Sequence, residues 1–136
     1  MESKSNMRKI MILDDEEDIA LLFKEGLEII GFHNVAVYND PIKALYEIIS
    51  NTYDLILIDI IMPNMNGLEF YSNLKKTEKE SGSKVCFFSA GEFSEDRIRD
   101  MFPDLKNQKT ILIRKPIRIK ELLIKIDEIM DEKPQI

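Results

Sequence analysis

The chain of 136 residues has a net charge of −6, and 44% of its residues are hydrophobic and 32% charged. This composition is typical of one soluble globular domain, and the negative charge disfavours a nucleic-acid-binding protein. No apolar stretch approaches the roughly 20 residues of a membrane-spanning helix, and the polar residues 1–9 predict no secretory signal.

Short apolar runs alternate along the chain with longer segments of helical periodicity. The runs predict strands over residues 8–13, 35–37, 54–58, 84–88 and 110–113. A helix is expected after each strand: over residues 16–30, after the Asp40 cap, around residues 68–74, from the Ser94 cap to near Pro103, and over residues 119–129. We expect one domain over residues 7–130, with flexible tails at 1–6 and 131–136.

Some side chains have a predicted environment. Cys86 lies inside an apolar run and is expected to be a buried structural residue, which fits a reducing cytoplasmic compartment. His33, the only histidine, is expected on the surface at the start of the second strand. The first helix is expected to bury one apolar face, formed by Ile19, Leu22, Phe23, Leu27 and Ile30.

Five strands alternating with five helices predict an α/β protein with a parallel sheet covered by helices on both faces. The third strand has almost no polar residue, as expected for a strand buried on both faces. Such doubly wound sheets bind ligands outside the carboxyl ends of their strands. Functional residues are therefore sought at the strand ends.

Reactive side chains follow four of the predicted strands. Asp14 and Asp15 follow the first strand, Asp59 the third, Ser89 the fourth and Lys115 the fifth. The carboxyl ends of parallel strands meet at one edge of the sheet, so these groups are predicted to lie together. Acids, a hydroxyl and an ammonium in one place suit a divalent cation and a phosphoryl group.

The acids favour a hard divalent cation. If the first and third strands are neighbours, about 4.8 Å apart, the carboxylates of Asp14, Asp15 and Asp59 crowd together and repel one another. Mg²⁺, or Mn²⁺ in its place, resolves this repulsion and bridges to phosphate, whereas the absence of neighbouring His or free Cys in the sequence disfavours zinc.

Asp59 is the candidate phosphoacceptor. It closes the most apolar strand and is followed by an irregular loop, so one carboxylate oxygen could attack an incoming phosphoryl donor. Lys115 would neutralise charge on the phosphoryl oxygens, and Ser89 would donate a hydrogen bond to one of them.

These motifs resemble the receiver domain of two-component response regulators from about residue 7 to residue 130. The matching motifs are Asp14-Asp15-Glu16, Asp59 with Met62-Pro63 and Asn66-Gly67 behind it, Ser89-Ala90, and Lys115-Pro116. The resemblance implies a flavodoxin-like (βα)5 three-layer sandwich with strand order 2-1-3-4-5.

The resemblance also implies a role for each residue. Asp59 would be the phosphoacceptor, Asp15 a direct metal ligand, Asp14 an acid that reaches the metal mainly through water, and the backbone carbonyl of Ile61 a further ligand. Lys115 would pair with the phosphoryl group, and Ser89 would move toward that group.

It further implies a phosphoryl donor, a phosphohistidine on a sensor histidine kinase or phosphotransfer protein, or a small acyl phosphate. The output would pass through the surface of the fourth helix, fifth strand and fifth helix to an unidentified effector. The chain would be a self-phosphorylating switch and not a turnover enzyme, with no nucleic-acid or membrane partner.

The sequence departs from the family pattern in the fifth strand and in the segment before it. Leu112 stands where an aromatic switch residue is usual, and the segment Arg97 to Lys109 carries Pro103 in place of a familiar Gly-Ala stretch. Ile61 and Gly91 offer no polar side chain to position a hydrolytic water. We therefore expect slow loss of the phosphoryl group.

Other functions remain open from the sequence. A phosphatase or other hydrolase would need an acid or base near Asp59, but Ile61 stands two residues on. A flavodoxin-like cofactor binder would need a phosphate-binding loop where this chain has consecutive acids. A degenerate docking module is disfavoured by the complete acid set. The chain could also be a receiver module excised from a longer regulator.

Overall fold

Five parallel strands form one sheet in the order β2-β1-β3-β4-β5, as predicted. The computed structural model describes residues 7–77 and 82–131, so the predicted tails at 1–6 and 131–136 lie outside the described residues except for residue 131. The strands are β1 (Lys9–Leu13), β2 (Asn34–Tyr38), β3 (Leu55–Asp59), β4 (Lys84–Ser89) and β5 (Leu112–Arg114). The domain limits 7–130 stay a prediction.

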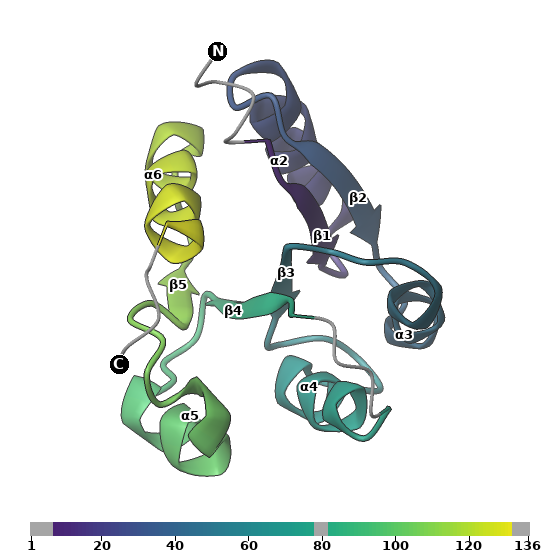
Figure 1. The fold of residues 1–136 in the computed structure, drawn as a ribbon, viewed down its shortest axis with the longest axis vertical. Coiled ribbons are helices and arrows are strands. Elements are labelled where there is room, and N and C mark those ends of the chain that lie inside the picture. The colour runs from purple at the N-terminus through teal and green to yellow at the C-terminus, as the bar shows by residue number, and fades with distance from the viewer. Residues whose placement is uncertain (1–6, 78–81, 132–136) are drawn as a thin grey trace.

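Helices cover the sheet on both faces, which gives a three-layer sandwich (Figure 1). The helices are α2 (Glu17–Ile29), α3 (Pro41–Ser50), α4 (Gly67–Lys75), α5 (Glu95–Met101) and α6 (Ile119–Met130), with the short 3-10 helix η1 (Pro103–Leu105) after α5. One core lies between the sheet and α3, α4 and α5, and the second between the sheet and α2 and α6. No described helix is long and apolar enough to cross a membrane.

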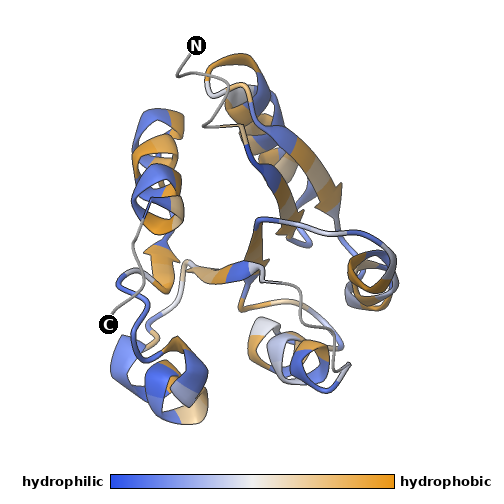
Figure 2. Cartoon of the chain, viewed as in Figure 1, coloured by the Kyte–Doolittle hydropathy of each residue, from blue (hydrophilic) through white to orange (hydrophobic). Residues whose placement is uncertain are grey.

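The central strand β3 shows why the sheet sits inside the molecule. All its residues are buried, and alternate side chains enter opposite cores: Ile56 and Ile58 one, Leu55 and Leu57 the other. Figure 2 accordingly shows hydrophobic colour along the inner strands and both colours on the helices. Cys86 is fully buried in the core of α2 and α6, as predicted.

The helix ends follow the predicted caps. The side chain of Asp40 accepts a hydrogen bond from the backbone N of Ile42 at 2.9 Å at the start of α3. Asn66 and Glu69 form a reciprocal capping box at the start of α4. Ser94 caps α5, and that helix ends at Met101, just before Pro103.

The predicted face of the first helix is partly wrong. Phe23 and Leu27 are buried with Ala20, but Ile19 and Leu22 are 36% and 63% exposed. Ile30 is exposed as well, because it follows the last turn of the helix.

The predicted surface position of His33 is also wrong. The side chain is only 5% exposed, and its Nδ1 accepts a hydrogen bond from the backbone N of Arg8 at 3.2 Å. The short connection between α2 and β2 turns the ring inward against the beginning of β1. This bond satisfies the buried ring nitrogen.

Candidate metal and phosphoryl site

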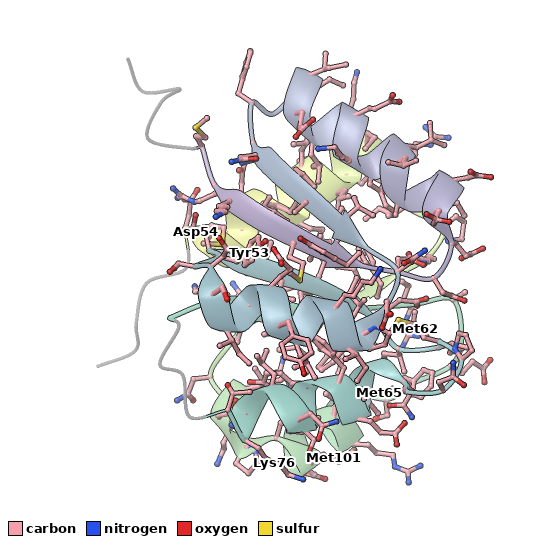
Figure 3. All side chains as sticks on the ribbon, turned by 90° about the vertical axis from the view of Figure 1, so that its right-hand side faces the viewer. Tyr53, Asp54, Met62, Met65, Lys76 and Met101 are labelled. Atoms are coloured by element: carbon pink, nitrogen blue, oxygen red, sulfur yellow. The ribbon has the colours of Figure 1, made fainter. Side chains whose placement is uncertain are left out.

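The predicted residues meet at the carboxyl edge of the sheet. Asp14 follows β1, Asp59 ends β3, Ser89 ends β4 and Lys115 follows β5. Met62 and Met65, which follow β3, lie at the opposite end of the molecule from Tyr53 and Asp54, which precede it (Figure 3). The chain therefore brings its reactive groups to one end because the strands are parallel.

Three acids form a cluster at this edge. One carboxylate oxygen from each of Asp14, Asp15 and Asp59 lies within 4.8 Å of the others. Asp14 is fully buried and Asp59 is 5% exposed, while Asp15 is exposed. A set of carboxylate oxygens with one open side suits a hard cation that keeps water ligands, such as Mg²⁺.

Lys115 supplies the positive charge beside these acids. Its Nζ lies 2.6 Å from Oδ2 of Asp14, 3.6 Å from Oε1 of Glu16 and 3.8 Å from Oδ1 of Asp59. Burial disfavours the charged lysine, but the hydrogen bond to Asp14 and the nearby acids outweigh it and raise the pKa of Lys115. The ammonium therefore stays charged at neutral pH.

Asp14 uses both of its oxygens within the protein. Oδ1 accepts a hydrogen bond from the backbone N of Glu16 at 2.9 Å, and Oδ2 receives Lys115. The first contact tightens the turn that leads from β1 into α2. Asp14 thus holds the lysine and shapes the turn that presents Asp15.

Asp59 is destabilised as an anion in the metal-free protein. Burial raises the pKa of Asp59 to about 7, Lys115 opposes the shift, and Asp14 and Asp15 add to it. A bound cation would favour the ionised carboxylate. A cation should therefore stabilise the site most when the carboxyl group of Asp59 is ionised.

Gly67 fixes the loop behind Asp59. Its backbone N donates to the carbonyl of Ile60 at 2.8 Å, and a Cβ at this position would overlap the carbonyl oxygen of Asp59. Only glycine fits this approach of α4 to the end of β3. The motif Asn66-Gly67 thus caps the helix and packs the loop that carries Ile61.

The acid pocket has a volume of about 270 Å³. Its lining consists of Asp15, Glu16, Asp59, Ile61, Ala90 and Lys115. Ile61 is 56% exposed and leaves an apolar side chain at the rim. The contribution of its carbonyl oxygen to metal binding stays a prediction.

Ser89 lies at this edge but is turned out of the pocket. It is fully buried, and its Oγ accepts a hydrogen bond from the backbone N of Gly91 at 2.9 Å. It is absent from the described residues that line the acid pocket. The structure thus places Ser89 next to the acids without a contact between its hydroxyl and Asp59.

Sequence reasoning missed two features of the edge. A second hollow of about 400 Å³ shares Glu16, Ala90 and Lys115 with the acid pocket, and its wall is mostly apolar. The rest of its lining is Ile19, Leu22, Phe23, Pro116 and Ile117. Arg114 also reaches the loop after Ser89. The apolar surplus on the first helix was the available signal for the hollow, whereas nothing in the sequence indicates the arginine contact.

Comparison with known proteins gives one family. Residues 10–127 match the response regulator receiver domain family. Over 95% of its length the chain is 31% identical to the response regulator ArlR of Staphylococcus saprophyticus, and over 91% it is 32% identical to the transcriptional regulatory protein CpxR of Escherichia coli. These alignments cover 55% and 50% of the relatives, so the chain spans about half the length of the curated relatives it matches.

Solved structures agree with these matches. The receiver domain of a Francisella response regulator superposes with a TM-score of 0.72 at 30% identity, covering 91% of this chain and 97% of that one. A CheY-like receiver domain protein from Methanospirillum hungatei gives 0.75 at 27% identity, covering 92% and 94%.

Proposed function

The chain belongs to the response regulator receiver domain family, and on that basis we propose that Asp59 accepts a phosphoryl group in a Mg²⁺-dependent step. The donor is a phosphohistidine on a sensor histidine kinase or phosphotransfer protein, or a small acyl phosphate. The observation that carries the proposal is the cluster of three carboxylates within 4.8 Å of one another. A buried lysine lies beside them.

The donor set supports Mg²⁺, or Mn²⁺, held by Asp15 and Asp59 and by the backbone carbonyl of Ile61. Because both oxygens of Asp14 already have partners in the protein, Asp14 would reach the cation through water. When bound, the cation supplies charge that neutralises the carboxylates and the phosphoryl oxygens.

Transfer makes one bond and breaks one. A carboxylate oxygen of Asp59 attacks phosphorus, the P–N bond of the phosphohistidine breaks, and its electron pair stays on the departing imidazole nitrogen. Lys115, 3.8 Å from Asp59, then gains a phosphoryl oxygen as an additional partner. The hydroxyl of Ser89 would donate a hydrogen bond to another phosphoryl oxygen.

The apolar hollow beside the acid pocket is where we place the protein that carries the phosphohistidine. It shares Glu16, Ala90 and Lys115 with the acid pocket, so a donor packed there holds its phosphoryl group near Asp59. Burial of apolar surface in the hollow would supply affinity for the donor protein, and the residues of the acid pocket would carry out the phosphoryl transfer.

The phosphorylated domain acts as a switch and not as a turnover enzyme. Movement of Ser89 would alter the surface of α5, β5 and α6, which presents the message to an effector that the sequence does not identify. No nucleic-acid or membrane contact is assigned to this domain. A cytoplasmic location stays a prediction, as does the identity of any further domain joined to this one.

The proposal is tested by incubating the protein with acetyl phosphate and Mg²⁺ and measuring its intact mass. We expect one added phosphoryl group, absent when Mg²⁺ is chelated and absent in Asp59→Asn. Asp100→Asn, at an exposed acid on α5, is the matched control and should still gain the group. Hydrolysis of the donor without a covalent adduct would instead support a hydrolase.

A further inference from the structure

We propose that Arg114 is a positioning residue that holds the β4–α5 loop in the form in which Ser89 is turned away from the acid pocket. The inference rests on the proposed function, because it concerns how readily Ser89 reaches a phosphoryl group on Asp59. Arg114 lies outside the acid cluster and would set the balance between the form with Ser89 turned away and the form with Ser89 directed at Asp59.

The guanidinium of Arg114 donates hydrogen bonds to two carbonyl groups of the β4–α5 loop. Nη1 donates to the carbonyl oxygen of Gly91 at 3.2 Å, and Nη2 donates to that of Phe93 at 2.8 Å. Arg114 is the last residue of β5 and the register partner of Ser89. The arginine therefore spans from the edge strand to the loop that begins where Ser89 ends β4.

Gly91 is held from two sides. Its N–H donates to Oγ of Ser89 at 2.9 Å, while its carbonyl accepts from Arg114 at 3.2 Å and from Oγ of Ser89 at 3.4 Å. If the hydroxyl of Ser89 turned to a phosphoryl oxygen with the loop in place, the N–H of Gly91 would lose this partner. The bond is part-buried, and losing it without a new partner costs stability, so the serine and the loop should move together.

The same loop lies close to the rim of the acid pocket and to α5. A Cβ built on Gly91 would lie 3.1 Å from Cδ1 of Ile61 at the rim of the acid pocket and 3.3 Å from the ring of Phe93. Phe93 in turn lines a hollow of about 350 Å³ with Arg97, Ile98 and other residues of α5. A shift of the loop away from Arg114 would therefore change the packing both at the rim of the acid pocket and against α5.

The contact also fits what a release mechanism needs. Arg114 is exposed, so its two hydrogen bonds can be exchanged for water when the loop moves. A buried guanidinium could not be released at such low cost. The two hydrogen bonds from Arg114 thus favour the resting conformation of the loop, and they can break when Ser89 binds a phosphoryl group on Asp59.

The test compares Arg114→Met, which keeps the length of the stem, with Arg114→Lys and with Lys120→Met, at an exposed lysine on α6, as a charge-matched control. The first measurement is amide hydrogen exchange at residues 90–93 without phosphoryl donor. We expect exchange at least fivefold faster in Arg114→Met, partial rescue in Arg114→Lys and no change in Lys120→Met.

The second measurement is the affinity for beryllofluoride, a phosphoryl mimic, with Mg²⁺ present. Two exposed hydrogen bonds lost from the resting form predict about fivefold tighter binding by Arg114→Met. Unchanged exchange, or weaker beryllofluoride binding, would overturn the proposal. If even the wild-type protein binds no beryllofluoride, the proposed function fails, while the exchange data still decide whether Arg114 holds the loop.

Discussion

Lys115 and Asp14, which are 101 residues apart in the sequence, form a buried ion pair in which Nζ lies 2.6 Å from Oδ2. The same Nζ is 3.8 Å from Asp59. Without a metal ion, Lys115 therefore pairs mainly with Asp14, which shapes the turn after β1, and only more weakly with Asp59, the proposed phosphoacceptor. A phosphoryl group on Asp59 would compete for it.

The first prediction concerns this pair. Lys115→Met should lower the free energy of unfolding by about 3 kcal/mol at pH 7, because it leaves buried carboxylates without a counter-charge. Urea unfolding in the presence of EDTA measures the loss. Lys120→Met, at an exposed lysine on α6, should change stability by less than about 0.5 kcal/mol. Equal losses in the two variants would show that the pair is not the cause.

The second prediction follows from the raised pKa of Asp59, about 7 against an ordinary value of 3.8. Between these pH values the folded protein holds a proton that the unfolded chain has released, so the contribution of Asp59 to stability falls as pH rises through this window. Asp59→Asn should therefore stabilise the metal-free protein by about 2 kcal/mol at pH 8 and much less at pH 4.5.

Urea unfolding at both pH values, with EDTA throughout, checks this dependence. The control is Asp100→Asn, which removes an exposed carboxyl group and should give the same small change at both pH values. A stabilisation by Asp59→Asn that did not grow with pH would contradict the raised pKa.

The third prediction concerns the cation. Mg²⁺ at ten times its dissociation constant should raise the free energy of unfolding of the wild-type protein by about 1.4 kcal/mol, because it binds the folded state alone. Asp15→Asn should lose this response while its metal-free stability stays near that of the wild type, since Asp15 is exposed. Melting temperatures across a Mg²⁺ titration measure both. A full response in Asp15→Asn would remove this acid from the ligand set.

The fourth prediction is slow loss of the phosphoryl group. The rim of the acid pocket carries the apolar Ile61, and Gly91 has no side chain, so neither orients an attacking water. After removal of the donor, the phosphorylated form followed by intact mass should persist for minutes or longer. Ile61→Asn, which adds a polar group at the rim, should shorten this lifetime severalfold. A wild-type lifetime of seconds would contradict the argument.

The parts of the site that sequence could predict depend on backbone topology alone. Asp14, Asp59 and Lys115 follow parallel strands, and parallel strands bring their carboxyl ends together whatever the details of the loops. The alternating apolar runs predicted a parallel sheet covered by helices on both faces, whereas the strand order came from the family resemblance. Leu112 in place of the usual aromatic lies in β5 and is buried, which the apolar pattern of that strand also indicates.

The parts that sequence could not predict depend on how loops pack. The hydroxyl of Ser89 faces Gly91 because of a turn whose shape no local pattern reports. His33 is buried because the connection before β2 turns inward, and Arg114 contacts two carbonyl groups in a loop 20 or so residues earlier in the chain. The exposed Leu22 shows that apolar periodicity alone can overstate the buried face of a helix, since the smaller Ala20 is buried in the same helix.

The most direct test of the account is to locate the phosphoryl group. Protein treated with acetyl phosphate and Mg²⁺ is reduced with borohydride, which converts an aspartyl phosphate to homoserine, and its peptides are sequenced by mass spectrometry. The account predicts homoserine at position 59 alone, and none without Mg²⁺. Homoserine at another acid, or a phosphoryl group that survives on Ser89 or His33, would contradict it.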